Sequence, residues 1–288
     1  GMKAGKDFDV AHCPERINPG DPKWNVYNIP RNIGSTSKEA TEKTARFYRS
    51  FISGEINEMK DLKTTEATKI IENTFRDINI AFVNELAKSF DVLDIDLVEV
   101  INGASNKPFA FMAHFPSCGV GGHCIPVDPY YLIDRAGKSG FDHKFLKLAR
   151  EINNSMPAYT LELLTDALNE LERSVKRTKV GLLGLSYKAN VGDLRQSPSI
   201  EIRKRLENMH ADLQVFDPYF DELNTSKSLD ELLDHSEALV IATDHNEFKE
   251  LTPELLKKKG IKVVIDGKNC LDKKKFKENG IFYKGIGS

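Results

Sequence analysis

The chain has 288 residues, of which 40% are hydrophobic and 29% are charged, and its formal net charge at pH 7 is -2. This near-balanced charge indicates no nucleic-acid partner, and no apolar run approaches the roughly 20 residues that span a bilayer. The first residues lack the apolar core of a signal peptide, and the four cysteines follow no disulfide framework spacing. We therefore expect a cytoplasmic protein with reduced thiols and no membrane partner.

The first 60 residues predict two strands and a helix. Residues 8–12 form a short apolar strand, and residues 25–34 form a second strand region. Ser37 is a plausible N-cap for a helix that continues to about Phe51. Because two strands are too few for a stable sheet, we interpret this segment as the tail of an α/β domain.

The middle of the chain, residues 61–156, is predicted to be helical throughout. A long, largely buried helix over residues 64–90 is indicated by apolar residues at steps of 3 to 4, namely Ile71, Phe75, Ile78, Phe82, Leu86 and Phe90. Lys69, Asn73 and Arg76 fall on the opposite side, which is either a functional face or an ordinary solvated one. The apolar stripe exceeds what the flanking segments can cover, so we expect a homodimer.

Further helices are predicted at residues 94–101, from Pro129 onward and at residues 144–172, the last with a kink or break at Pro157. After residue 178 the pattern changes to alternating strands and helices. The strands are expected at residues 179–185, 213–217, 238–243 and 262–266, and the helices at residues 199–209, 228–235 and 253–259. This order predicts an α/β fold with a doubly wound parallel sheet, whose ligands bind at the carboxyl ends of the strands.

A cysteine loop, residues 119–128, carries the strongest chemical signal. Its sequence, Gly-Val-Gly-Gly-His-Cys-Ile-Pro-Val-Asp, places Cys124 on a glycine-rich loop four residues before Asp128. Glycines allow close approach to a ligand, and a reactive thiol needs access, so we interpret Cys124 as a nucleophile. The alternatives are a structural buried thiol, a metal site of Cys118, His123 and Cys124, and a redox pair of Cys118 with Cys124.

A polar loop, residues 184–198, follows the first strand of the last block. Its glycines are too far apart for a dinucleotide fingerprint, so a bound phosphate would be held by Lys188, Arg195 and backbone amides. An ordinary surface loop is the alternative. Asp217 ends the next strand, where an acidic residue often binds a ribose, although a strand-ending Asp-Pro is also a common turn.

Four ordered motifs resemble the family of UDP-glucose, UDP-N-acetylglucosamine and UDP-N-acetylmannosamine 6-dehydrogenases, the UDP-glucose/GDP-mannose dehydrogenase family, over nearly the whole chain. The motifs are residues 13–20, residues 66–81, the cysteine loop and the polar loop. The resemblance implies a remnant of an NAD-binding Rossmann domain at residues 1–60, a helical dimerisation domain at residues 61–156 and a UDP-binding α/β domain at residues 157–288. Because the nicotinamide-binding glycine fingerprint is not in this sequence, we expect the chain alone to be inactive.

The family oxidises C6 of the sugar of a UDP-sugar to a carboxylate, using NAD and a covalent thioester. The resemblance implies that Cys124 is the nucleophile, that Lys69 and Asn73 stabilise the reacting oxygen or a water, and that Asp128 keeps Lys69 charged and assists proton transfer. Glu15 corresponds to the acid near the hydrolytic water. Some members carry a further acid at the position of Pro19, so Glu15 or a water chain would act alone here.

The resemblance also implies ligand contacts. Lys188 matches a contact to the substrate diphosphate, with Gly121, Phe111 and Arg76 as further substrate contacts, whereas Arg195 and Glu15 would contact NAD. Residues 122–129 are closer to the N-acetylhexosamine members than to the UDP-glucose members. Residues 107–112 and the absence of an arginine near Ala110 favour the gluco over the manno epimer. The alternatives are a UDP-glucose 6-dehydrogenase and a non-catalytic UDP-sugar-binding module.

Overall fold

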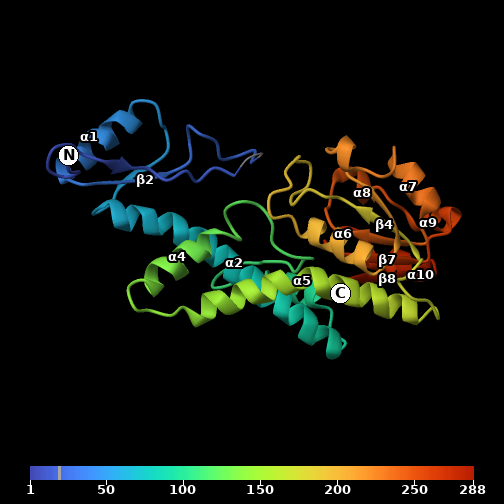
Figure 1. The fold of residues 1–288 in the computed structure, drawn as a ribbon. Coiled ribbons are helices and arrows are strands. Elements are labelled where there is room, and N and C mark those ends of the chain that lie inside the picture. The colour runs from blue at the N-terminus through green and yellow to red at the C-terminus, as the bar shows by residue number, and fades with distance from the viewer. Residues whose placement is uncertain (19–20) are drawn as a thin grey trace. The chain divides into compact units, whose positions relative to one another are not determined.

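The computed structural model describes residues 1–18 and 21–288, so Pro19 lies outside the described residues. The chain forms two compact units, Gly1–Phe75 and Arg76–Ser288. The boundary between them falls within the long helix α2 (Leu62–Val92), which is longer by two residues at each end than the sequence predicts. Figure 1 shows the order of the elements within each unit.

The first unit contains a three-stranded sheet in the order β1-β2-β3. The strands are β1 (Ala11–His12), β2 (Arg31–Ser35) and β3 (Ile56–Glu58), with β1 antiparallel and β3 parallel to β2. Helix α1 (Lys38–Arg49) begins after Ser37, whose side chain accepts a hydrogen bond from the Ala40 N–H, as the N-cap prediction requires. β3 is too short and too polar to be identified in the sequence, and it completes the sheet.

The predicted burial of the apolar stripe on α2 is wrong for three of its members. The side chains of Ile71, Phe75 and Phe82 are exposed by 61%, 45% and 55%. In the second unit the inward face of α2 is partly polar, because buried Asp77 and Asn84 pair with side chains of α5 (Lys144–Asn169). Polar side chains can be buried when they find partners on another element, and a periodicity argument does not detect such pairs.

The predicted break at Pro157 is wrong, because α5 continues through this residue for 12 more residues, to Asn169. A proline in a helix removes one backbone hydrogen bond. Pro157 is buried next to Met156, and both lie in a segment of α5 that packs into the main core of the second unit. The burial of this apolar segment offsets the loss of one bond. The two other helices of this region are α3 (Leu97–Ala104) and α4 (Asp128–Gly137).

The second unit contains a parallel five-stranded sheet in the order β5-β4-β6-β7-β8. The strands are β4 (Lys179–Leu183), β5 (Asp212–Phe216), β6 (Ala238–Ile241), β7 (Val263–Asp266) and β8 (Phe282–Gly285). The helices between them are α6 (Pro198–Asn208), α7 (Leu229–His235), α8 (Asn246–Lys249), α9 (Pro253–Lys259) and α10 (Lys273–Glu278). The predicted doubly wound α/β sheet is confirmed, with α8, α10 and β8 in addition.

Helices cover both faces of this sheet (Figure 1). Side chains of α5 and α6 share one core with alternate residues of the strands, and side chains of α7, α9 and α10 share a second core with the other residues. The chain passes from β4 to β5 on one side and then to β6 on the other. The carboxyl end of β4 is therefore the topological switch point, where α/β sheets bind ligands.

In the part of the chain that the structure describes, no helix combines the length and the apolar character needed to cross a membrane.

Candidate active site

The cysteine loop presents its thiol to solvent. Cys124 is exposed, whereas Asp128 is buried at the first residue of α4. The backbone N–H groups of Val127 and Asp128 donate to the carbonyl oxygen of Cys124 at 3.2 and 2.8 Å. Cys124 thus lies in the turn that leads into the N-terminus of α4. This placement excludes the structural buried-thiol interpretation for Cys124.

The cysteine loop packs directly on the polar loop, within the second unit. The Gly122 N–H donates to the carbonyl oxygen of Arg195 at 2.8 Å. A Cβ atom placed on Gly121 would lie 2.5 Å from the Cβ of Tyr187, so only glycine allows this approach. The structure therefore brings together two motifs that are about 60 residues apart in the sequence.

Opposite charges gather where the two loops meet. Arg195 donates through Nε and Nη2 to the carboxylate of Asp193, with an Nη2–Oδ2 distance of 2.6 Å. The hydrogen bond and the charge of Asp193 raise the pKa of Arg195, and Cys124 adds to this in the same direction. The hydrogen bond from Arg195 in turn lowers the pKa of Asp193. An exposed guanidinium close to the thiol is suited to contact a phosphate or a developing anion.

The remaining residues predicted in this unit lie as follows. Lys188 and Gly121 are half-buried on the polar loop and the cysteine loop, respectively. Phe111 is 40% exposed, and Arg76 is exposed on α2. None of these four positions is fully buried.

The first unit holds the other predicted group of residues. Lys69 donates from Nζ to the backbone carbonyl oxygen of Glu15 at 2.6 Å. The carboxylate of Glu15 accepts from Arg31 at 3.0 Å and from the N–H groups of Arg16 and Ile17. Partial burial raises the pKa of Glu15, but these hydrogen bonds outweigh burial and lower the pKa overall. Glu15 is therefore a carboxylate at neutral pH, able to accept a proton or orient a water.

Asn73 is buried in α2, with 7% of its surface exposed, so the solvated-face interpretation does not hold for this residue. The Glu15–Lys69 pair lies in the first unit, and Cys124, Asp128 and Arg195 lie in the second. The convergence of these two sets on one reacting carbon stays a prediction.

The structure does not support the alternatives that involve Cys118. This thiol is fully buried and donates to the carbonyl oxygen of Ala242, while Cys124 is exposed, and both are free thiols. Among residues 1–18 and 21–288, no three His, Cys, Asp or Glu side chains are grouped as metal ligands.

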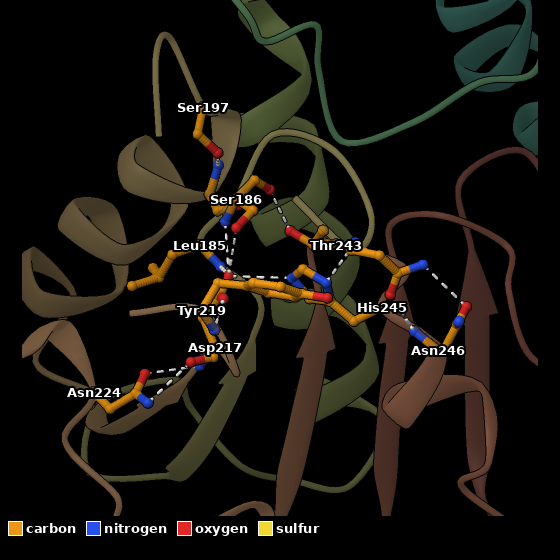
Figure 2. A network of polar contacts seen from close by, with 11 residues as sticks. Leu185, Ser186, Ser197, Asp217, Tyr219, Asn224, Thr243, His245 and Asn246 are labelled. Carbon is orange, nitrogen blue, oxygen red and sulfur yellow. Dashed lines mark hydrogen bonds and ion pairs between the residues drawn. The ribbon is translucent and has the colours of Figure 1, made fainter. Parts of the chain in front are cut away.

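The sequence allowed two interpretations of Asp217, a ribose contact or a turn. In the structure, Asp217 forms hydrogen bonds within the protein. Its side chain is fully buried, and Oδ2 accepts from the N–H groups of Leu185 and Ser186 at 2.7 and 2.8 Å (Figure 2). A second oxygen, Oδ1, accepts from the Tyr219 N–H. A carboxylate so enclosed cannot reach a ribose. His245, which follows β6, lies 3.2 Å from the same carboxylate, and sequence reasoning missed it. Its position after a strand next to β4 was the available signal.

Two family models match the chain. The central domain of the UDP-glucose/GDP-mannose dehydrogenase family matches residues 63–155, and the UDP binding domain of the same family matches residues 181–273. The cysteine loop lies in the first match, and the polar loop lies in the second.

Individual relatives agree with the family models. A UDP-N-acetyl-D-mannosamine dehydrogenase of Pyrococcus horikoshii is 38% identical over 100% of this chain and 66% of its own length. A UDP-N-acetyl-D-glucosamine 6-dehydrogenase of Pseudomonas aeruginosa is 34% identical over 96% of this chain and 67% of its own length. The chain thus spans about two thirds of the length of the curated relatives it matches.

Solved structures extend the agreement to the fold. The UDP-D-ManNAc dehydrogenase of Pyrococcus horikoshii superposes with a TM-score of 0.90 at 36% identity, covering 99% of this chain and 66% of that one. An NDP-N-acetyl-D-galactosaminuronic acid dehydrogenase of Methanosarcina mazei gives the same TM-score, 0.90, at 32% identity, covering 99% and 64%. The chain belongs to the UDP-glucose/GDP-mannose dehydrogenase family.

Proposed function

We propose that this protein acts as an NAD-dependent UDP-N-acetylhexosamine 6-dehydrogenase. The observation that carries the proposal is the docking of the cysteine loop on the polar loop, which joins an exposed thiol to the loop whose cationic residues are suited to a diphosphate. The names of the relatives, dehydrogenases of UDP-N-acetylmannosamine and UDP-N-acetylglucosamine, support the substrate class.

In this proposal Cys124 forms the covalent intermediate. The C6 alcohol first loses a hydride and its hydroxyl proton to give the aldehyde. The Cys124 thiolate attacks this aldehyde and forms a C–S bond, and the resulting oxyanion takes up a proton to give a thiohemiacetal. Loss of that proton and of a second hydride from C6 then leaves a thioester. NAD, when bound, supplies the chemistry of accepting the hydrides. Water attacks the thioester carbon, the C–S bond breaks, and the products are the uronic acid and the free thiol.

The other residues would assist these steps. Lys69 and Asn73 are proposed to stabilise the developing oxyanion or to orient water, with Asp128 keeping the ammonium charged. Glu15, whose pKa is lowered, is ionised at neutral pH and suited to receive a proton from the hydrolytic water. The close approach of Lys69 to the backbone of Glu15 supports a shared site for these two residues.

Ligand contacts are proposed on the same basis. Lys188 would bind the diphosphate of the substrate, with Gly121, Phe111 and Arg76 as further contacts. Arg195 would bind a phosphate of NAD, because its guanidinium is exposed. A phosphate could replace the carboxylate of Asp193, which is on the same loop, as the partner of this guanidinium.

The domain division at residues 1–60, 61–156 and 157–288 and a homodimer are part of the proposal. The exposed apolar side chains of α2, including Ile71, Phe75 and Phe82, support a second copy as partner. Light scattering should give twice the chain mass at micromolar concentration, and a Phe82→Asp variant should be monomeric. A wild-type monomer at that concentration would contradict the dimer.

Alkylation of the thiol tests the proposed site. Iodoacetamide should modify Cys124, and saturating UDP-N-acetylglucosamine or UDP-N-acetylmannosamine should slow this reaction, as measured by peptide mass spectrometry. Half-buried Cys270 serves as the internal control, because its modification should not depend on ligand. An unchanged rate at Cys124 with bound UDP-sugar would contradict the proposal.

The same alkylation assay with different UDP-sugars distinguishes the candidate substrates. UDP-glucose in the same assay tests the alternative substrate, and the two N-acetylhexosamine epimers test the predicted preference for the gluco form. The inactivity of the 288-residue chain alone also stays a prediction, which NADH production from the purified chain with either epimer would contradict.

A further inference from the structure

The carboxyl ends of three adjacent strands meet in one buried polar network (Figure 2). Ser186 follows β4, Asp217 follows β5, and Thr243 and His245 follow β6. All four side chains are nearly or completely buried. This is the switch point of the sheet, where a dinucleotide fold of this kind leaves a crevice for its ligand. Here the residues directly after the strands are buried and contact one another beneath the polar loop.

Asp217 occupies the place of an anion at the start of the polar loop. Besides the two N–H groups of Leu185 and Ser186, Oδ2 accepts from the Ser186 hydroxyl at 3.0 Å. Successive backbone N–H groups of this kind form an anion-binding concavity. The carboxylate therefore fixes the first residues of the polar loop without any ligand.

His245 fixes the loop at a second point. The backbone N–H of Asn190 donates to Nδ1 of His245 at 2.9 Å. Because an N–H can only donate, Nδ1 carries no proton in this arrangement, and Nε2–H is the donor to Asp217 at 3.2 Å. A single neutral imidazole thus links the carboxylate to residue 190 of the polar loop.

Two further contacts restrict this link. The side-chain amides of Asn190 and Asn246 pair, and the Asn246 N–H donates to the Asn190 side chain at 3.1 Å. The rings of Tyr219 and Phe248 pack on the imidazole, with centroid distances of 5.1 and 5.4 Å, and set its plane. The backbone of the polar loop is therefore held at residues 185–186 and again at residue 190. Lys188 lies midway between these two points.

We infer that His245 and Asp217 are positioning residues, which fix the backbone on both sides of Lys188 so that its ammonium is preorganised for the diphosphate of a UDP-sugar. This inference rests on the proposed function, because it assumes that Lys188 binds the diphosphate of a UDP-sugar. Preorganisation matters because a loop that must be ordered on binding loses affinity.

A set of variants at position 245 tests the inference on the 288-residue chain. His245→Phe keeps an aromatic ring for the packing on Tyr219 and Phe248 but removes both hydrogen bonds. His245→Asn restores an acceptor close to the position of Nδ1. Asn246→Ala, at an exposed position, weakens the link to Asn190 without changing the buried network. His235→Phe is the matched control, because His235 faces Asp212 at the opposite end of β5.

Two measurements are made on each variant after circular dichroism has verified the fold. Hydrogen exchange followed by mass spectrometry reports on peptides that cover residues 186–197, and titration calorimetry reports on UDP. We expect His245→Phe to speed exchange in these peptides and to raise the dissociation constant of UDP about tenfold, the equivalent of one hydrogen bond to a charged group. His245→Asn should recover part of both effects, Asn246→Ala should show a smaller loss, and His235→Phe should resemble the wild type.

The outcomes are distinguishable. Unchanged exchange at residues 186–197 in both His245→Phe and Asn246→Ala would overturn the inference. So would faster exchange with unchanged UDP affinity, because the loop would then be held for a reason other than binding. A wild-type chain that does not bind UDP would refute the proposed function itself, and the inference with it.

Discussion

The two ends of β5 carry the same pair of residue types in opposite environments. At its first residue, Asp212 faces His235 at 3.3 Å, with 52% and 19% of their side chains exposed. Just past its last residue, Asp217 faces His245 at 3.2 Å, with 0% and 1% exposed. An exposed pair contributes little to stability, whereas a buried charge must be fully partnered. The comparison teaches that the same pair of residue types plays a different structural part at the two ends of β5, because only the pair at the carboxyl end is buried.

The largest expected effect comes from removing the buried carboxylate. Asp217→Ala leaves His245 and the N–H groups of Leu185 and Ser186 without their acceptor, so we expect the free energy of unfolding to fall by about 4 kcal/mol. Asp212→Ala should lower it by less than about 1 kcal/mol. Urea unfolding followed by circular dichroism measures both. Equal losses of unfolding free energy in the two variants would show that burial does not distinguish the two ends of β5.

The close packing at the same edge predicts the next effect. Gly184 has a φ of +91°, and a Cβ there would lie 2.4 Å from the Cβ of Thr243. Gly260, with a φ of +83°, has open space at the same point. Gly184→Ala should therefore destabilise by about 3 kcal/mol and Gly260→Ala by about 1 kcal/mol, as measured by thermal unfolding. Similar losses of stability in the two variants would show that backbone strain, and not crowding by Thr243, determines the loss in Gly184→Ala.

The pH dependence of stability sharpens the comparison further. Burial alone would raise the pKa of Asp217, but the hydrogen bonds from His245 and from the N–H groups of Ser186 and Leu185 hold it far below its ordinary value of 3.8. The stabilisation is therefore complete above pH 3.8, the pKa in the unfolded chain, and is lost as the pH falls further. The difference in unfolding free energy between wild type and Asp217→Asn should be constant near pH 6 and should shrink below pH 4. A difference in unfolding free energy that grows as the pH falls would contradict the lowered pKa of Asp217.

The smallest expected effect is at the exposed pair. His235→Asn should change the free energy of unfolding by at most about 0.5 kcal/mol and leave UDP binding unchanged, because the pair is partly solvated and lies at the end of β5 opposite the proposed site. Chemical unfolding and calorimetry with UDP measure the two quantities. A loss of UDP affinity in this variant would show that UDP binding depends on the amino end of β5, which contradicts the proposed site.

Much of this architecture was predictable from local patterns. Continuous apolar runs such as residues 179–185 and 238–243 identify buried parallel strands, and the motifs around Cys124 and Arg195 identify the family, which the comparisons confirm. β8 was missed because its apolar run is only two residues, Phe282 and Tyr283, before Lys284 and Gly285.

The errors have a common physical origin. The burial of α2 depends on partners that are distant in sequence, since Asp77 is buried only because Arg150 of α5 pairs with it. The link between Asp217 and His245 is likewise a tertiary contact, formed when strands β5 and β6 lie on either side of β4. Periodicity reports what one element prefers by itself, so side-chain pairs between elements escape it.

The footprint of UDP on the chain tests the central claim, that the carboxyl edge of the five-stranded sheet with its two docked loops is the nucleotide-sugar site. Hydrogen exchange with and without saturating UDP should show protection in residues 184–198 and 119–128. The competing location is a groove of about 590 Å³ along α5 and α6, lined by Ala158, Leu161 and Met209 among others. Protection confined to that groove, with both loops unchanged, would contradict the account.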